Sequence, residues 1–213
     1  MQMMKKGLFI TFEGPDGSGK STQLRMLAEW LEQQNKQVYL TREPGGTRLA
    51  EKIRGLLLDK TDEPVSPEAE LLLFGASRAQ HVRQVILPFL ENGGIVLCDR
   101  FLDSTTAYQG YARGLDMTFI NQLHQFCVCG RMPDLTFLLD LPLEEGRRRV
   151  AQRQGENLDR MEAENSRFHQ AVRDGFLTIA RQEPARVKVI DARQSVQAIA
   201  QTIRQEVENA LAD

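Results

Sequence analysis

The sequence predicts a single α/β domain, spanning residues 1–213, in which a parallel sheet is covered by helices on both faces. Short apolar runs of β-like composition alternate with stretches of helical periodicity, a pattern typical of parallel sheets with crossover helices. No repeat, low-complexity tract or Gly/Ser linker divides the 213 residues. The pattern does not indicate the order of the strands, which are predicted at Leu8–Glu13, Gln37–Thr41, Ile95–Asp99, Leu135–Asp140 and Val187–Asp191.

The first predicted strand leads into a glycine-rich loop that fits G-x-x-x-x-G-K-[ST] and precedes a helix-like run. Glycines let backbone N–H groups and the helix N-terminus point at phosphate oxygens, Lys20 adds a positive charge, and Ser21 is suited to hold a magnesium ion. Such a turn can be merely structural, but the Lys-Ser ending between a strand and a helix favours a nucleoside triphosphate site. The predicted donor-binding residues are Gly14, Pro15, Asp16, Gly17, Ser18, Gly19, Lys20, Ser21 and Thr22.

Asp16 is an unusual residue for a loop that binds anions. Aspartate tolerates turn conformations, so its role can be structural. The alternative is a contact with a sugar hydroxyl or with a water on magnesium. Either contact would place a second substrate beside the triphosphate.

A long helix is predicted from Ser66-Pro67-Glu68 towards Glu91, because a capping hydroxyl, a proline at the first helical position and an early acid mark a helix start. Phe74 and Arg78 share one face of this helix. An unpaired buried guanidinium is costly, so Arg78 reaches solvent, meets an internal acid or faces a polar ligand in a cleft. Periodicity alone favours the first two explanations.

The predicted strand Ile95–Asp99 ends in an aspartate, and Arg100 follows it directly. Large remodelling ATPases commonly carry Asp-Glu after this strand. A GTPase would carry a separate guanine-binding motif, Asn-Lys-x-Asp, and the nearest match in this sequence, which begins at Asn35, lacks the aspartate. A carboxylate followed by a guanidinium suits phosphoryl transfer to an acceptor that is itself an anion. The pair therefore favours a small-molecule kinase over a switch or a mechanical ATPase.

The segment from Glu144 to Arg160 is rich in arginine. A charge run is usually the solvated face of a helix. Beside a triphosphate, however, additional cations offset the repulsion between phosphates and the charge of the transition state, and arginine offers a planar fork of donors. The segment is therefore also a candidate lid, at about residues 147–160.

Bulk composition indicates a globular protein of the cytoplasm. A formal net charge of −2 argues against nucleic acid as a main partner. No apolar run approaches the roughly 18 residues that cross a bilayer, so no membrane partner is expected, and the N-terminus is a poor secretory signal. Cys98, Cys127 and Cys129 lack zinc-site spacing and are expected to be thiols in a reducing compartment.

The sequence resembles the thymidylate kinases along nearly its whole length. Its matching motifs occur in the family's order, namely Phe12-Glu13-Gly14 with the phosphate loop, Thr41-Arg42-Glu43-Pro44-Gly45-Gly46-Thr47, Phe74-Gly75-Ala76-Ser77-Arg78, Asp99-Arg100-Phe101, Ala107-Tyr108-Gln109-Gly110, Pro133-Asp134-Leu135-Thr136 and Leu158-Asp159-Arg160. The resemblance implies ATP-dependent phosphorylation of dTMP to dTDP. It also implies the P-loop nucleoside-monophosphate-kinase fold, with a five-stranded parallel sheet and a mobile lid.

The resemblance implies an acceptor site for dTMP. Phe74 would stack on thymine and Arg78 would hydrogen-bond a base carbonyl, which reverses the preference from periodicity. Arg54 and Arg100 resemble the groups that hold the acceptor phosphate, and Asp16 resembles a carboxylate near its sugar. The remaining implied acceptor residues are Glu43, Thr105, Tyr108 and Gln109. Of these, Tyr108 resembles an aromatic residue that disfavours a ribose 2′-hydroxyl.

The resemblance further implies direct in-line transfer, with Lys20, Arg100, Asp16 and one lid arginine as the catalytic groups. Family members with an arginine in the phosphate loop have it where this chain has Ser18, so the lid must supply the cation. Arg153 is the first candidate and Arg160 the second, whereas Arg147 and Arg149 are expected on the supporting helix.

Arg193 is a candidate for the adenine side, and Ser21 and Asp99 for the Mg²⁺ that accompanies ATP. The family also suggests a homodimer. Two rival functions stay open from the residues themselves, a kinase with another acceptor and a nonenzymatic ATP-binding regulator.

Overall fold

The computed structural model describes residues 7–60, 63–154 and 158–212, without the side chains of residues 153 and 154. The chain forms a five-stranded, all-parallel sheet in the order β2-β3-β1-β4-β5. Every predicted strand is confirmed, and β2 lies one residue later than expected. The strands are β1 (Leu8–Glu13), β2 (Val38–Arg42), β3 (Ile95–Asp99), β4 (Leu135–Asp140) and β5 (Val187–Asp191).

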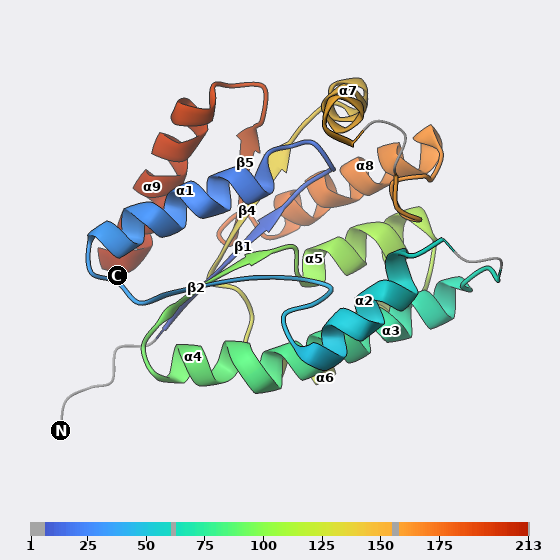
Figure 1. The fold of residues 1–213 in the computed structure, drawn as a ribbon, viewed down its shortest axis with the longest axis horizontal. Helices are drawn as coiled ribbons and strands as arrows, with labels where there is room; N and C mark the ends of the chain where they lie inside the picture. The colour runs from blue at the N-terminus through green and yellow to red at the C-terminus, as the bar shows by residue number, and fades with distance from the viewer. Residues whose placement is uncertain (1–6, 61–62, 155–157, 213) are drawn as a thin grey trace.

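Helices connect the strands and cover both faces of the sheet (Figure 1). In the described ranges, none of them is both long and apolar enough to cross a membrane. The α-helices are α1 (Lys20–Gln33), α2 (Arg48–Leu58), α3 (Pro67–His81), α4 (Leu87–Glu91), α5 (Leu102–Thr105), α6 (Met117–Val128), α7 (Leu143–Gln154), α8 (Ser166–Gln182) and α9 (Val196–Ala212). Within the described residues, two segments are π-helices, η1 (Val82–Ile86) and η2 (Thr106–Ala112).

Alternation along β1 divides the core into two layers. Ile10 and Phe12 pack in a cluster with Leu27 of α1 and residues of α9, whereas Phe9 packs with Val82 and Phe101 on the opposite face. Successive side chains of a strand point to opposite faces, so one strand can anchor both layers. Figure 1 accordingly shows α1 and α9 on one side of the sheet and α3, α4 and α6 on the other.

The predicted long helix begins where expected. The Ser66 hydroxyl accepts a hydrogen bond from the Ala69 amide at 3.3 Å, and Pro67 occupies the first turn. The helical segment runs through α3, η1 and α4 to Glu91. It widens into the π-helix just before Pro88, whose missing N–H interrupts the α-helical hydrogen-bond ladder.

The strand register brings the candidate functional segments to one edge of the sheet. Asp99 at the end of β3 stands opposite Phe12 of β1 and Arg42 of β2. The loops that follow these three strands therefore leave the sheet side by side. Ligands of open α/β folds bind at this carboxyl edge.

Candidate active site

The phosphate loop joins β1 to α1, as the sequence predicts. Gly14, Gly17 and Gly19 have φ values of +132°, +78° and +93°, and a Cβ at Gly14 would lie 2.4 Å from the carbonyl oxygen of Leu139. These positions require glycine for conformation and, at Gly14, for space. Lys20 begins α1, and its Nζ donates hydrogen bonds to the carbonyl oxygens of Gly14 at 3.0 Å and Pro15 at 2.9 Å.

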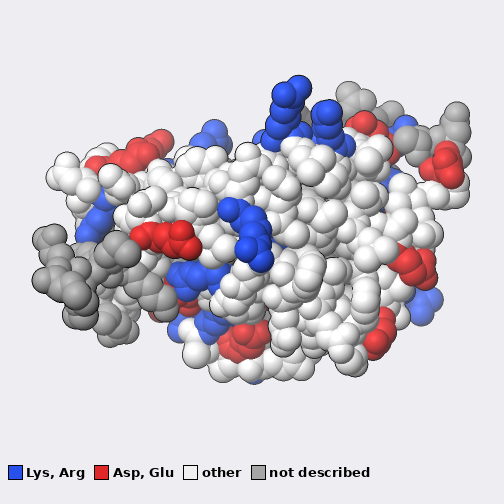
Figure 2. Space-filling view, turned by 90° about the horizontal axis from the view of Figure 1, so that it is seen from below, with Lys and Arg blue, Asp and Glu red and all other residues white. Residues whose placement is uncertain are grey.

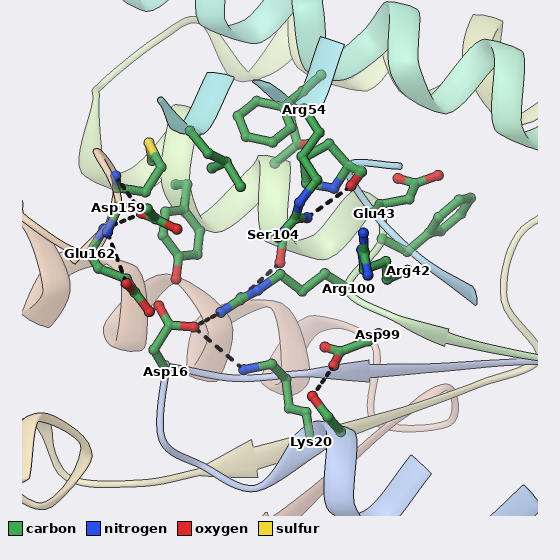
Figure 3. Close-up of a pocket in the computed structure, with 18 of the residues that line it drawn as sticks. Asp16, Lys20, Arg42, Glu43, Arg54, Asp99, Arg100, Ser104, Asp159 and Glu162 are labelled. Atoms are coloured by element: carbon green, nitrogen blue, oxygen red, sulfur yellow. Dashed lines mark hydrogen bonds and ion pairs between the residues drawn. The ribbon is translucent and has the colours of Figure 1, made fainter. Parts of the chain in front are cut away.

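A cavity of about 560 Å³ extends from this loop along the carboxyl edge of the sheet (Figure 3). Its volume lies in the range of pockets that hold small ligands. At one end it is lined by Asp16, Gly17, Gly19, Lys20, Ser21 and Thr22, and farther along by Phe74, Arg78, Thr105, Tyr108 and Gln109. The structure thus brings the predicted acceptor residues and six of the predicted loop residues into one continuous space, whereas Gly14, Pro15 and Ser18 are not among its lining residues.

Between these two groups lies a cluster of charges, which Figure 3 shows converging. Arg100 Nη2 donates to Asp16 Oδ1 at 2.5 Å, and Lys20 Nζ lies 3.9 Å from the same oxygen. Burial opposes the charge of Asp16, but Arg100 and Lys20 outweigh it and lower its pKa to about 2. Burial and the nearby Arg100 lower the pKa of Lys20 to about 8. At neutral pH the cluster therefore carries two cations around one carboxylate.

Arg100 is held in an unusual backbone conformation, with φ +66°. A non-glycine residue in this region signals a conformation that the surrounding structure imposes. Its Nη1 donates to the Gly14 carbonyl oxygen at 3.1 Å and to Ser104 Oγ at 3.2 Å. The guanidinium is thereby fixed against the phosphate loop.

Ser21 and Asp99 lie next to each other at the loop, with Ser21 Oγ donating to Asp99 Oδ2 at 2.6 Å. A hydroxyl and a carboxylate are the oxygen donors that magnesium prefers, and magnesium with a nucleotide is commonly held by few protein groups together with phosphates and water. Within the described ranges, no cluster of three or more His, Cys, Asp and Glu side chains is suited to a metal. The pair therefore fits a nucleotide-bound magnesium ion rather than an all-protein cage.

Arg78 is 2% exposed and is paired with an internal acid. Its Nε donates to Glu43 Oε2 at 2.8 Å and its Nη2 donates to the Phe101 carbonyl oxygen at 3.0 Å, while Nη1 has no hydrogen-bond partner among the described residues. The internal acid among the three explanations for Arg78 is thus confirmed. Arg78 also lines the cavity, so this N–H group is a candidate donor for a ligand.

Glu43 supports Arg78 from behind. One carboxylate oxygen accepts from Arg78, and the other lies 3.0 Å from His81 Nδ1. The peptide bond between Glu43 and Pro44 is cis. Since both oxygens already have partners, the geometry suits Glu43 to orienting Arg78.

The π-helix η2 carries Tyr108 and Gln109, which line the cavity together with Thr105 at the end of α5. π-Helical turns occur frequently at functional sites. The Arg100 guanidinium lies 5.4 Å from the Tyr108 ring centroid, and burial raises the pKa of the Tyr108 hydroxyl, which stays protonated. Thr105 Oγ1 accepts from Arg78 Nη2 at 3.0 Å.

Arg54 enters the cavity from α2, across from the phosphate loop in Figure 3. Its Nη1 donates to the Pro44 carbonyl oxygen at 2.9 Å. Burial and the nearby Arg42 lower its pKa. A ligand anion between Arg54 and Arg100 would relieve this crowding of positive charge.

The arginines of α7 occupy different places. Arg147 Nη1 donates to Ser166 Oγ at 2.6 Å, away from the cavity lining. Arg149 lines the cavity. Its Nη1 donates to the carbonyl oxygen of Ala192 at 3.1 Å and lies 3.5 Å from the carbonyl oxygen of Gly17. Arg149 therefore connects the predicted supporting helix directly to the phosphate loop.

The remaining arginines with a predicted role are Arg153 and Arg160 of the lid and Arg193 on the adenine side. The backbone of Arg153 belongs to α7, while its side chain and residues 155–157 of the predicted lid lie outside the described part. Arg160 is not among the lining residues, and its Nε donates to the Leu57 carbonyl oxygen at 2.8 Å at the end of α2. Arg193 is largely exposed, pairs with Asp191 and is likewise outside the lining.

Glu13 is a functional neighbour to which the sequence reasoning gave no role. Its Oε1 accepts from the amides of Phe101 at 2.7 Å and Ser104 at 3.2 Å, and its Oε2 accepts from Ser104 Oγ at 2.6 Å. The buried carboxylate thus holds the backbone around Arg100. The signal in the sequence was an acid that ends an otherwise apolar strand.

Glu13 makes the stability of the protein depend on pH. Burial, together with the nearby Asp103, raises its pKa from 4.5 to about 7. Between pH 4.5 and pH 7 the folded chain keeps a proton on Glu13 that the unfolded chain has released. The contribution of Glu13 to the free energy of unfolding is therefore complete below pH 4.5, and it falls by up to about 3 kcal/mol as the pH rises to 7. We expect Glu13→Gln, which is neutral throughout, to lack this fall.

Urea unfolding at pH 5, 6, 7 and 8 measures this difference, with the exposed Glu144→Gln as the control. The gap in unfolding free energy between wild type and Glu13→Gln should change with pH, whereas Glu144→Gln should follow the wild type. Parallel curves for wild type and Glu13→Gln would contradict the assignment.

Comparison with known proteins agrees with this geometry. The family model described as thymidylate kinase matches residues 12–203. The chain is 49% identical to a thymidylate kinase of Gloeobacter violaceus, covering 94% of each chain, and 54% identical to that of Ectopseudomonas mendocina, covering 89% of this chain and 90% of the other.

Among solved structures, the crystal structure of thymidylate kinase from Ehrlichia chaffeensis aligns with a TM-score of 0.76 at 39% identity, over 95% of this chain and 98% of that one. The family match covers nearly all of the sheet, the phosphate loop and the cavity lining. The chain therefore belongs to the thymidylate kinase family.

Proposed function

We propose that this protein transfers the γ-phosphoryl group of ATP to the phosphate of dTMP, giving ADP and dTDP, a step in dTTP synthesis. Family membership supports the reaction. One observation of the structure carries it, a continuous cavity whose lining includes both the phosphate loop and a chamber with an aromatic ring and a buried arginine. Donor and acceptor can be bound in this space at the same time.

The acceptor chamber suits a pyrimidine deoxynucleotide. In this proposal Phe74 stacks on the base, and Nη1 of Arg78, which has no hydrogen-bond partner among the described residues, donates to a base carbonyl oxygen. Tyr108 fills the space near the sugar and disfavours a 2′-hydroxyl. We assign the acceptor phosphate to Arg54 and Arg100, since both are cations that line the same cavity.

The transfer is direct and in line, without a covalent enzyme intermediate. The acceptor phosphate is already an anion, so no strong general base is needed. Lys20 and the loop amides hold the donor phosphates, Arg100 aligns the acceptor, and Asp16 holds Arg100 in place. Catalysis then depends on positioning and on positive charge around the moving group.

The Ser21 hydroxyl and the Asp99 carboxylate would hold the Mg²⁺ that accompanies the nucleotide. The ion supplies positive charge against the phosphate oxygens. Arg153 is the lid cation, one helical turn after Arg149, which contacts the phosphate loop. Closing the lid excludes water, which would otherwise accept the phosphoryl group.

The test is a coupled assay of ADP release with purified protein, ATP and magnesium, and with dTMP, dUMP, dCMP, dGMP or dAMP as acceptor. We expect dTMP to give the highest kcat/KM. Preference for another monophosphate would assign a different acceptor. ATP binding without product from any acceptor would identify a regulator instead.

We also propose that the protein is a homodimer joined through α3 and α6, which pack side by side. Both helices carry large exposed apolar side chains, with Leu72 at 52%, Phe119 at 46% and Phe126 at 80% exposed. Figure 2 views the molecule from the side of α4 and α6, where charged groups surround a broad uncharged area. Light scattering should give twice the mass of one chain, and the mass of a single chain would exclude the dimer.

A cytoplasmic location and the organisation as a single domain both stay predictions.

A further inference from the structure

Glu70 lies behind the wall of the acceptor chamber, on α3 one turn before Phe74. It is 0% exposed and is not itself part of the cavity lining. Its Oε1 accepts a 2.7 Å hydrogen bond from Nε2 of Gln109, which does line the cavity. A fully buried carboxylate in direct contact with a cavity residue can determine how that residue meets a ligand.

Two arginines keep the Glu70 carboxylate charged. Arg160 Nη1 lies 2.7 Å from Oε2, and Arg113 Nη2 lies 3.2 Å from the same oxygen. Burial opposes the charge, but the hydrogen bonds from Arg113, Gln109 and Arg160 outweigh it and lower the pKa of Glu70. An ionised carboxylate can only accept hydrogen bonds.

This one-way chemistry fixes the Gln109 side chain. A primary amide has a donating nitrogen and an accepting oxygen, which can exchange places by a half turn. Facing Glu70, only the nitrogen is compatible, because an amide oxygen would repel the carboxylate. The oxygen of Gln109 is therefore directed away from Glu70.

We propose that Glu70 is a positioning residue for base selection, which sets Gln109 to present an acceptor rather than a donor to the nucleobase. The inference rests on the proposed function. Thymine and uracil carry a proton on N3 that such an oxygen accepts, whereas cytosine has a bare N3. A cytosine in the chamber would leave the buried oxygen without this bond, and unmade buried hydrogen bonds are costly.

The principal test is Glu70→Gln, assayed with dTMP, dUMP and dCMP. The new amide can donate as well as accept, so Gln109 is free to turn over. We expect the ratio of kcat/KM for dTMP over dCMP to fall about tenfold, the effect of one unmade hydrogen bond. The ratio of dTMP over dUMP should stay constant, because both bases carry the N3 proton.

Glu164→Gln is the matched control. Glu164 forms an ion pair with Arg113 at 2.6 Å, so this variant removes a carboxylate from the same network without touching Gln109. It should keep the wild-type ratio of dTMP over dCMP. In a Gln109→Leu background, Glu70→Gln should have no further effect on that ratio, because the amide through which it acts is gone.

The outcomes separate the inference from the proposed function. A wild-type protein that does not phosphorylate dTMP contradicts the function. A wild type active on dTMP with an unchanged dTMP over dCMP ratio in folded Glu70→Gln overturns only the role of Glu70. An equal fall in Glu164→Gln, or a full effect in the Gln109→Leu background, also overturns it.

A second measurement needs no substitution at Glu70. In crystals of the wild-type protein with dTMP, one amide atom of Gln109 should stay within hydrogen-bond distance of Glu70 while the other contacts N3 of the base. A Gln109 amide that leaves Glu70 on binding dTMP would contradict the inference even if Glu70→Gln failed to fold.

Discussion

Replacing Arg153 by alanine is expected to lower kcat by about 10³- to 10⁵-fold, the range for removing a catalytic arginine from phosphoryl transfer. The phosphate loop has Ser18, and no cation, just before Gly19-Lys20, so in the proposed mechanism Lys20 and one lid arginine neutralise the transferring group. This charge matters most in the transition state. The KM values for dTMP and ATP should therefore change only a few fold.

Arg148→Ala is the control on the same helix. The Arg148 side chain is 61% exposed and pairs with Glu145 at 2.8 Å. Its loss should leave kcat near that of wild type. Steady-state kinetics for both variants decide the matter, and a normal kcat for Arg153→Ala would exclude Arg153 as the lid cation.

Lys20→Met should lower kcat/KM by about 10²- to 10³-fold, the cost of removing one preorganised donor from a developing charge. Lys20 is 7% exposed and its ammonium is held by the loop carbonyls of Gly14 and Pro15. Methionine has a similar length and fills the space without the charge. The effect should appear both in turnover and in the KM for ATP.

Lys188→Met provides the comparison, because Lys188 lies on β5 with a 3.7 Å ion pair to Glu206, away from the cavity lining. It should retain full activity. If Lys20→Met kept wild-type kcat/KM while circular dichroism showed a folded protein, the role of the loop lysine would be wrong.

The sequence predicted the local elements well because their signals are local. The central strands β1, β3 and β4 are short, mostly apolar runs that are almost wholly buried, and the start of α3 follows from the Ser66 hydroxyl and Pro67 alone. The phosphate loop could also be predicted from the sequence, because such a loop requires glycines at positive φ and a lysine at the start of the following helix, all at fixed spacing.

The contacts that position the cavity residues could not be predicted from the sequence. Arg78 had three open explanations until the pairing with Glu43, 35 residues away, was seen. The hydrogen bond of Glu13 to the backbone of Phe101 joins β1 to the loop after β3. Periodicity reports which face a side chain occupies but not which distant residue meets it.

Local signals in the sequence predict the strands, the long helix that contains α3, the phosphate loop and, through the motifs, the family. The strand order, the pairing of Glu43 with Arg78 and the hydrogen bond between Glu70 and Gln109 become visible only in the folded chain. The physical reason is distance along the chain. Caps, turns and periodicity act within a few residues, whereas the register of parallel strands and buried ion pairs joins segments that only the complete fold brings together.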